Sequence, residues 1–212
     1  MTPEQLAQEA DRKIREWLVG RDKLVVAIDG YTGVGKTTLL ENLVKLNPGI
    51  LPVHWDDFII SVDDFEQVLK QTEDKSTAFE LHQTDHAAIE KLVTTFRGSS
   101  ENYQTKIFNP QTGQVDAPIE YDFSKKILVI DGVFLFHPKL LDHLWDKRIY
   151  LDGDVDEIDR RRVEREQKRW GDKYFPETHP DSHFRQITTA LKSYRETYHP
   201  EQKADLVLTN IA

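Results

Sequence analysis

The part of the sequence that most restricts the fold runs from residue 24 to residue 46. A compact apolar run at residues 24–28 ends in Asp29 and is followed by Gly30-Tyr31-Thr32-Gly33-Val34-Gly35-Lys36-Thr37. From Lys36 onward, leucine and valine recur at helical spacing until Asn47-Pro48-Gly49 ends the pattern. A buried strand, a glycine-rich turn and a helix in direct succession indicate the first unit of a parallel α/β sheet.

The turn has the spacing G-x-x-x-x-G-K-[ST], which is typical of loops that bind nucleotide phosphates. Glycines let backbone N–H groups converge on phosphate oxygens, and the helix N-terminus adds unpaired donors at the same place. Lys36 can reach the β- and γ-phosphates, and the Thr37 hydroxyl can ligate Mg²⁺. The alternative is a tight strand-to-helix turn that happens to contain a lysine. We predict that the nucleotide contacts Gly30, Gly33, Val34, Gly35, Lys36, Thr37 and Thr38.

Carboxylates follow two further apolar runs. Asp131 ends the run at residues 127–130, and Asp56 and Asp57 follow the run at residues 50–54. The carboxyl ends of parallel strands are where α/β sheets bind ligands. Asp131 can hold Mg²⁺ directly or through water, and Asp56 can accept the proton of an attacking hydroxyl. The alternatives are a plain turn at Asp131 and a loop or helix cap at the aspartate pair.

Arginines gather in one stretch of this acidic chain. The stretch contains Arg160, Arg161, Arg162, Arg165, Lys168 and Arg169. Asp154 and Glu157 precede it as a capping pair, which predicts a helix, and the apolar positions end before Arg165. We expect a lid at about residues 154–178, whose arginines fold over the γ-phosphate, offset its charge and exclude water. The alternative is a solvated helix face balanced by neighbouring glutamates.

Strand-like runs and helical patterns alternate along the rest of the chain. The remaining elements are expected at residues 148–151 and 205–208 (strands) and at residues 6–18, 87–96 and 184–198 (helices). This alternation predicts a three-layer α/β fold with a parallel sheet covered on both faces. No linker interrupts the pattern, so we predict one domain over residues 1–212. Residues 70–84 and 102–123 show little regularity, and the second segment is long enough to suggest a functional excursion.

Composition excludes several classes of function. With 28 Lys and Arg against 37 Asp and Glu, the formal charge is −9, which argues against general binding to nucleic acid or to a membrane surface. Cysteine is absent, so disulfides, thiolate nucleophiles and cysteine-ligated zinc are excluded. Neither a spanning apolar run nor a signal-peptide pattern occurs. We therefore expect a cytoplasmic protein.

Two absences narrow the nucleotide chemistry. Asp131 is followed by Gly132 rather than by a glutamate that could activate water, and no Asn-Lys-x-Asp segment for reading guanine occurs. Both favour phosphoryl transfer to a bound small molecule over autonomous ATP hydrolysis or a GTPase switch. The alternative of another class is an ATP-binding regulatory protein without an acceptor.

Taken together, these residues resemble the uridine kinase and phosphoribulokinase family of P-loop kinases, over nearly the whole chain after residue 23. The shared motifs are residues 29–38, Asp56-Asp57-Phe58, Ile130-Asp131-Gly132, the arginines of the lid and residues 204–208. The resemblance implies a five-stranded parallel sheet, with ATP and Mg²⁺ as donor. Asp56 corresponds to the family's base, and Arg162 and Arg165 correspond to lid arginines on the phosphates. Arg161 and Arg169 are expected beside them on the nucleotide.

The acceptor region departs from that family. Phe108 stands where uridine kinases have a tyrosine, and Gly113 stands where they have a histidine. The aspartate pair and Leu135-Phe136 also resemble nicotinamide riboside kinases. We expect a ribose 5′-hydroxyl as the acceptor, with the base open, and name Asp56, Phe58, Asp85 and Phe108 as its contacts. Asp85 equally suits a helix cap, and Trp55 suits either the core or the pocket wall.

Overall fold

The computed structural model describes residues 1–171, 174–179 and 182–210. Its central sheet has five parallel strands in the order β2-β5-β1-β6-β7. They are β1 (Leu24–Gly30), β2 (Ile50–His54), β5 (Ile127–Asp131), β6 (Lys147–Asp152) and β7 (Leu206–Thr209). The central strand β1 is buried along its whole length, which explains its continuous apolar run. The predicted parallel α/β sheet is confirmed.

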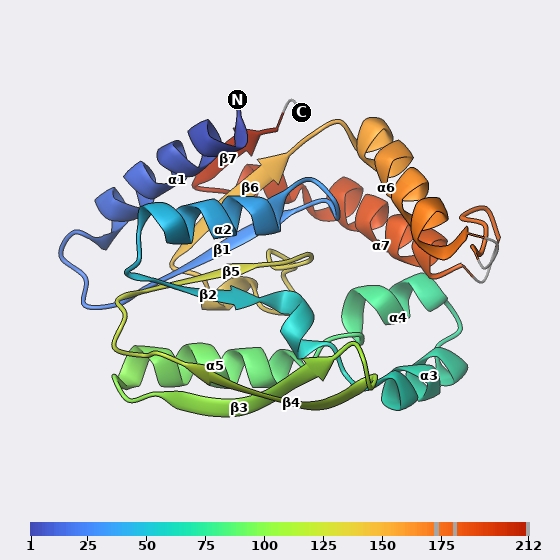
Figure 1. The fold of residues 1–212 in the computed structure, drawn as a ribbon, viewed down its shortest axis with the longest axis horizontal. Helices are drawn as coiled ribbons and strands as arrows, with labels where there is room; N and C mark the ends of the chain where they lie inside the picture. The colour runs from blue at the N-terminus through green and yellow to red at the C-terminus, as the bar shows by residue number, and fades with distance from the viewer. Residues whose placement is uncertain (172–173, 180–181, 211–212) are drawn as a thin grey trace.

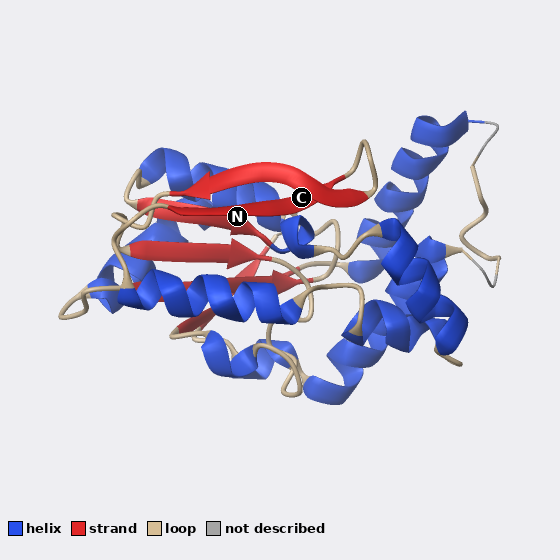
Figure 2. Ribbon diagram, turned by 90° about the horizontal axis from the view of Figure 1, so that it is seen from below, coloured by secondary structure: helices blue, strands red, loops and turns tan. Residues whose placement is uncertain are grey.

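Helices cover both faces of this sheet (Figure 2). They are α1 (Pro3–Leu18), α2 (Lys36–Leu46), α3 (Val62–Gln71), α4 (Lys75–Leu81), α5 (His86–Gly98), α6 (Val155–Trp170), α7 (His183–Tyr198) and α8 (Pro200–Lys203), with short 3-10 turns η1 (Trp55–Phe58) and η2 (Asp142–Leu144). Helices α1 and α2 contact each other and the sheet, whereas α6 and α7 lie together beyond its carboxyl edge (Figure 1). Within the described residues, no helix has both the length and the apolar character needed to cross a membrane.

The two segments expected to be irregular contain regular elements. In the first, the end of α3 is followed by α4, which is too short to show a helical repeat in sequence. In the second, β3 (Tyr103–Asn109) and β4 (Gln114–Tyr121) pair as an antiparallel hairpin. The hairpin was missed because Pro110, Gly113 and Pro118 indicate turns, although Pro118 lies within β4, where a two-stranded ribbon tolerates it. Gly113 has φ +72° at the turn, a conformation that favours glycine.

The register of the sheet decides which residues meet at its carboxyl edge. Ile28 of β1 pairs with Asp131 of β5, and Asp131 in turn pairs with His54 of β2. The loop between β1 and α2, the turn η1 and the start of α6 lie at this same edge (Figure 1). Residues that are far apart in sequence therefore converge where open α/β sheets bind ligands.

Candidate active site

The loop between β1 and α2 has the geometry of an anion cradle. A Cβ at Gly30 would lie 2.4 Å from the carbonyl oxygen of Leu151, so only glycine fits there. Gly35, at φ +107°, is the N-cap of α2 and gives it no side-chain cap. The first intrahelical bond runs from the N–H of Leu39 to the oxygen of Gly35 (3.0 Å), so the N–H groups of the preceding turn are left for a ligand.

Lys36 is held inside this loop. Its ammonium donates to the carbonyl oxygens of Gly30 (2.8 Å) and Tyr31 (2.9 Å), and the residue is buried. Burial lowers the pKa of Lys36, and the nearby carboxylates of Asp29, Asp131 and Asp56 oppose that shift. The amine is thus placed at the centre of the loop, close to three carboxylates.

Asp131 receives two partners at the strand edge. The Thr37 hydroxyl donates to Oδ2 of Asp131 (2.8 Å), and Nδ1 of His54 lies 2.7 Å from Oδ1. The hydrogen bond to Asp131 raises the pKa of His54. A hydroxyl and a carboxylate side by side are oxygen donors of the kind that Mg²⁺ prefers, and Mg²⁺ commonly takes its remaining ligands from water and phosphate. The donor set fits the metal that the sequence predicted.

The aspartate pair lies across the same pocket, on η1. Burial raises the pKa of Asp56, the positive charge of Lys36 lowers it, and the negative charge of Asp131 raises it. Burial likewise raises the pKa of Asp57, with His54 opposing. The pocket has a volume of about 580 Å³ and is lined by Thr32, Gly33, Gly35, Lys36, Thr37, Thr38, His54, Trp55, Asp56, Asp57, Asp131, Gly132, Val133 and Arg165. The groups that the sequence predicted to bind phosphate, to bind the metal and to accept a proton thus share one cavity. Trp55 is both buried and part of its wall.

The arginines of α6 fall into different environments. The helix begins as predicted, with the Asp154 side chain accepting from the N–H groups of Asp156 and Glu157. Arg165 lines the pocket from the lid side, and its side chain is 66% exposed, which matches the exposure expected for that half of the helix. Arg162 is buried and packs on the loop between β1 and α2, hereafter the phosphate loop. Its Cδ lies so near Gly33 that a Cβ at that glycine would be only 3.0 Å away.

Arg162 does not line the pocket, and neither do four further residues that were predicted to contact the nucleotide. Arg161 lies 3.7 Å from Glu157, and Arg169 lies on the exposed end of α6. Gly30 and Val34 are also absent from the pocket wall. Val34 is buried, and its N–H donates to the carbonyl oxygen of Tyr31 (3.2 Å). Gly30 and Val34 therefore support the conformation of the loop without lining the pocket. Their direct contact with nucleotide stays a prediction.

Three residues predicted to contact the acceptor are not brought to the pocket wall. Phe58 is buried in the core because η1 turns it inward, and Asp85 caps α5 by accepting from the N–H of Ala88 (2.9 Å). Phe108 lies on β3, opposite Val115 of the hairpin. In the structure Asp85 therefore acts as a helix cap, which was the alternative interpretation of this residue.

Sequence reasoning missed His54 and Asn210. His54 ends β2 as Asp131 ends β5, and their pairing in the sheet register brings the two side chains together. Asn210 directly follows β7, and its amide donates to the carbonyl oxygen of Val34 (2.8 Å) in the phosphate loop. The available signal was the position of each polar residue immediately after an apolar strand. That position marks the carboxyl edge.

The chain is similar in sequence and in fold to known proteins. Nicotinamide riboside kinase 1 of Rattus norvegicus is 29% identical over 141 residues, which cover 66% of each chain. Uridine-cytidine kinase C of Dictyostelium discoideum is 26% identical over 221 residues, covering 97% of this chain and 42% of its own. A structure described as a possible uridine kinase from Bacillus stearothermophilus superposes with a TM-score of 0.71 at 19% identity, over 98% of this chain and 100% of its own. That structure supports the fold.

The family assignment rests on a match along almost the whole chain. The model of the phosphoribulokinase / uridine kinase family matches residues 25–208, from the first strand to the last. This stretch contains the phosphate loop, Asp56, Asp131 and the arginines of α6. The chain belongs to the phosphoribulokinase / uridine kinase family, whose relatives here are P-loop kinases of small molecules.

Proposed function

We propose that this protein transfers the γ-phosphoryl group of ATP to a hydroxyl of a small molecule, with the ribose 5′-hydroxyl of a nucleoside as the acceptor. The observation that carries the proposal is the single pocket of about 580 Å³ lined by Lys36, Thr37, Asp131 and Asp56. A phosphate cradle, a donor set that fits Mg²⁺ and a carboxylate that can accept a proton are the groups that this reaction needs.

In the proposed step, the acceptor oxygen attacks the γ-phosphorus of ATP as its proton passes to Asp56. The bond from the γ-phosphorus to the β-γ bridging oxygen breaks, and ADP leaves. Lys36 and the N–H groups at the start of α2 stabilise the negative charge on the phosphates. The raised pKa of Asp56 makes this carboxylate a better proton acceptor than a fully solvated one. When bound, Mg²⁺ neutralises phosphate charge, and Thr37 and Asp131 would hold it.

Arginines of the lid would complete the site. We infer that residues 1–212 form one domain and that its lid covers about residues 154–178. Residues 172–173 of that lid lie outside the described part of the chain. Arg165, whose side chain is largely exposed at the pocket, is placed to approach the phosphates, and Arg162 already packs on the loop. Arg161 and Arg169 would join them on the nucleotide.

A second acceptor is favoured by a specific observation. Asp56 and Asp57 line the pocket together, and two carboxylates favour a cationic ligand. The nicotinamide ring of nicotinamide riboside carries a positive charge, and rat, human and mouse nicotinamide riboside kinase 1 are among the relatives. A nicotinamide riboside kinase is therefore the alternative within the family, and Phe58, Asp85 and Phe108 stay candidate acceptor contacts.

The test is ATP consumption by the purified protein with Mg²⁺ and a panel of acceptors. The panel contains uridine, cytidine, nicotinamide riboside, pantothenate and several sugars. Turnover that depends on one acceptor supports the proposal and identifies the substrate. ATP binding without turnover on any acceptor would instead favour an ATP-binding regulatory protein, and phosphate release without any acceptor would indicate an ATPase.

A further inference from the structure

Asp159, on the first half of α6, joins the lid helix to both the phosphate loop and α7. The hydroxyl of Tyr31, in the phosphate loop, lies 3.0 Å from each carboxylate oxygen of Asp159. Nη1 of Arg162 lies 2.8 Å from Oδ1, and Nζ of Lys192 on α7 lies 3.3 Å from Oδ2. Burial raises the pKa of Tyr31 most, and the negative charge of Asp159 raises it further. The Tyr31 hydroxyl therefore keeps its proton and donates it in a hydrogen bond to Asp159. One carboxylate thus connects three elements.

Arg162 is fixed by this arrangement. Its Nη1 also donates to the Thr188 hydroxyl (3.2 Å), and its guanidinium carbon lies 4.2 Å from the centre of the Phe184 ring. It is 7% exposed, and its aliphatic stem packs at Gly33 of the phosphate loop. A buried guanidinium needs a carboxylate partner, and among the residues that the structure describes Asp159 is the one that forms an ion pair with Arg162. Asp159 therefore supplies the charge that keeps this arginine beside the loop.

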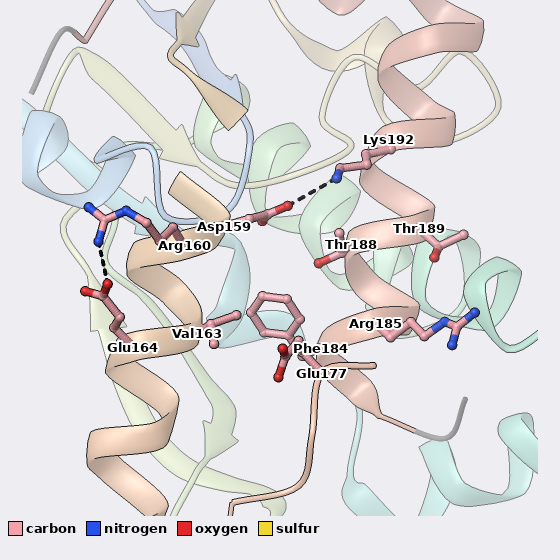
Figure 3. A pocket seen from close by; sticks show the side chains of 10 residues that line it. All are labelled: Asp159, Arg160, Val163, Glu164, Glu177, Phe184, Arg185, Thr188, Thr189 and Lys192. Atoms are coloured by element: carbon pink, nitrogen blue, oxygen red, sulfur yellow. Dashed lines mark hydrogen bonds and ion pairs between the residues drawn. The ribbon is translucent and has the colours of Figure 1, made fainter. Parts of the chain in front are cut away.

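Apolar packing between α6 and α7 is incomplete at this point. A cavity of about 490 Å³ lies between the two helices, and Asp159, Thr188 and Lys192 line it together with Val163 and Phe184 (Figure 3). Figure 3 shows Asp159 and Lys192 directed toward each other from the two helices, while Arg160 points away and pairs with Glu164. Ile158 packs this half of α6 into the core, and across the open cavity the polar contacts of Asp159 and Arg162 join α6 to α7.

We propose that Asp159 is a positioning residue that holds Arg162 against the phosphate loop before nucleotide binds. This inference rests on the proposed function, in which Arg162 contacts the phosphates. It divides the lid into a fixed part, which contains Arg162, and a part that closes, which contains Arg165. The γ-phosphate then meets one arginine that is already ordered, so less side-chain entropy is lost on binding.

The position of Arg162 is measured first in the nucleotide-free protein, by ¹⁵N relaxation of its Nε–Hε group, with the signal assigned from an Arg162→Lys variant. We expect an ordered group in the wild type and a mobile one in Asp159→Asn, while Asp156→Asn, on the exposed face of the same helix, leaves it ordered. An Arg162 signal that stays ordered in Asp159→Asn overturns the proposal. Because this readout needs no nucleotide, it decides the matter even if the protein proves not to be a kinase.

The second measurement is the preference for a non-hydrolysable ATP analogue over ADP, taken as a ratio of dissociation constants. We define the ratio as the Kd for ADP divided by the Kd for the ATP analogue. Asp159→Asn and Arg162→Met should each lower this ratio about tenfold, and the double variant should lower it no further than either single variant. If the fold-decrease of the double variant equals the product of the two single fold-decreases, Asp159 does not act through Arg162 and the proposal is overturned. If Asp159→Asn does not fold, Tyr31→Phe replaces it, with a smaller loss of the same sign and the same test of non-additivity.

Discussion

At the proposed phosphate end of the pocket, one continuous stretch, residues 30–38, supplies the cradle, the lysine and the hydroxyl that we propose binds the metal. The acceptor end contains Asp56 and Asp57 of η1, and the pocket is completed by Asp131 at the end of β5 and by Arg165 of α6. These three elements are separated in sequence and meet only in the folded protein. The phosphate end is defined by backbone conformation, as the glycine contacts show, whereas the acceptor end is defined by side chains. Substitutions at the two ends should therefore differ in what they abolish.

The largest effect is expected from Lys36→Met, at the phosphate end. Because methionine keeps the volume but removes the ammonium that stabilises the phosphates, kcat should fall about a thousandfold. Lys45→Met, on the exposed part of the same helix, is the matched control and should leave kcat unchanged. A Lys36→Met enzyme within about tenfold of wild-type kcat would remove Lys36 from its role on the phosphates.

Asp56→Asn should produce the next largest effect, at the acceptor end. Loss of the proton acceptor should lower kcat about a hundredfold with little change in the KM for ATP, whereas Asp57→Asn should cost less. Since the pKa of Asp56 is raised, wild-type kcat should fall as the pH drops through that raised value, because the protonated acid cannot accept a proton. Asp56 would be excluded as the base if the Asp56→Asn variant kept full activity, or if its kcat fell at low pH in the same way as that of the wild type.

Arg165→Ala should have an intermediate effect. Arg165 is exposed at the pocket and, in the proposed function, reaches the phosphates only when the lid closes, so kcat should fall about tenfold and the melting temperature should stay unchanged. Arg160→Ala is the control, because Arg160 pairs with Glu157 and Glu164 on the outside of the same helix. Equal losses from the two arginines would mean that the charge of the helix, rather than a contact from Arg165, is responsible.

The smallest effect on catalysis is expected from Asp85→Ala. Removal of the cap of α5 should cost about 1 kcal/mol of unfolding free energy, and Asp85→Asn, which keeps a capping oxygen, should restore most of it. Neither variant should change the acceptor KM by more than about twofold. An acceptor KM raised about tenfold in both variants would show that Asp85 contacts the acceptor as well as capping the helix.

The contrast between the two ends also explains what could be predicted. The phosphate loop was recognisable because its strand, its glycines, Lys36 and Thr37 are contiguous, and each follows a local conformational rule. The acceptor contacts were only partly predictable. Asp56 follows a strand and faces the pocket, but the buried position of Phe58 depends on how η1 turns, and a sequence pattern does not contain that information.

Sequence alone determined the α/β class, the five strands, the phosphate loop and the carboxylates at the strand ends, because hydrophobic periodicity and turn chemistry are local properties. Only the tertiary structure decided the pairing of His54 with Asp131, the support of the loop by Asn210 and the burial of Arg162 on the loop beside Asp159. Each of these contacts joins residues from different elements. Strand order and helix docking bring such residues together, and these are set by the packing of the whole core.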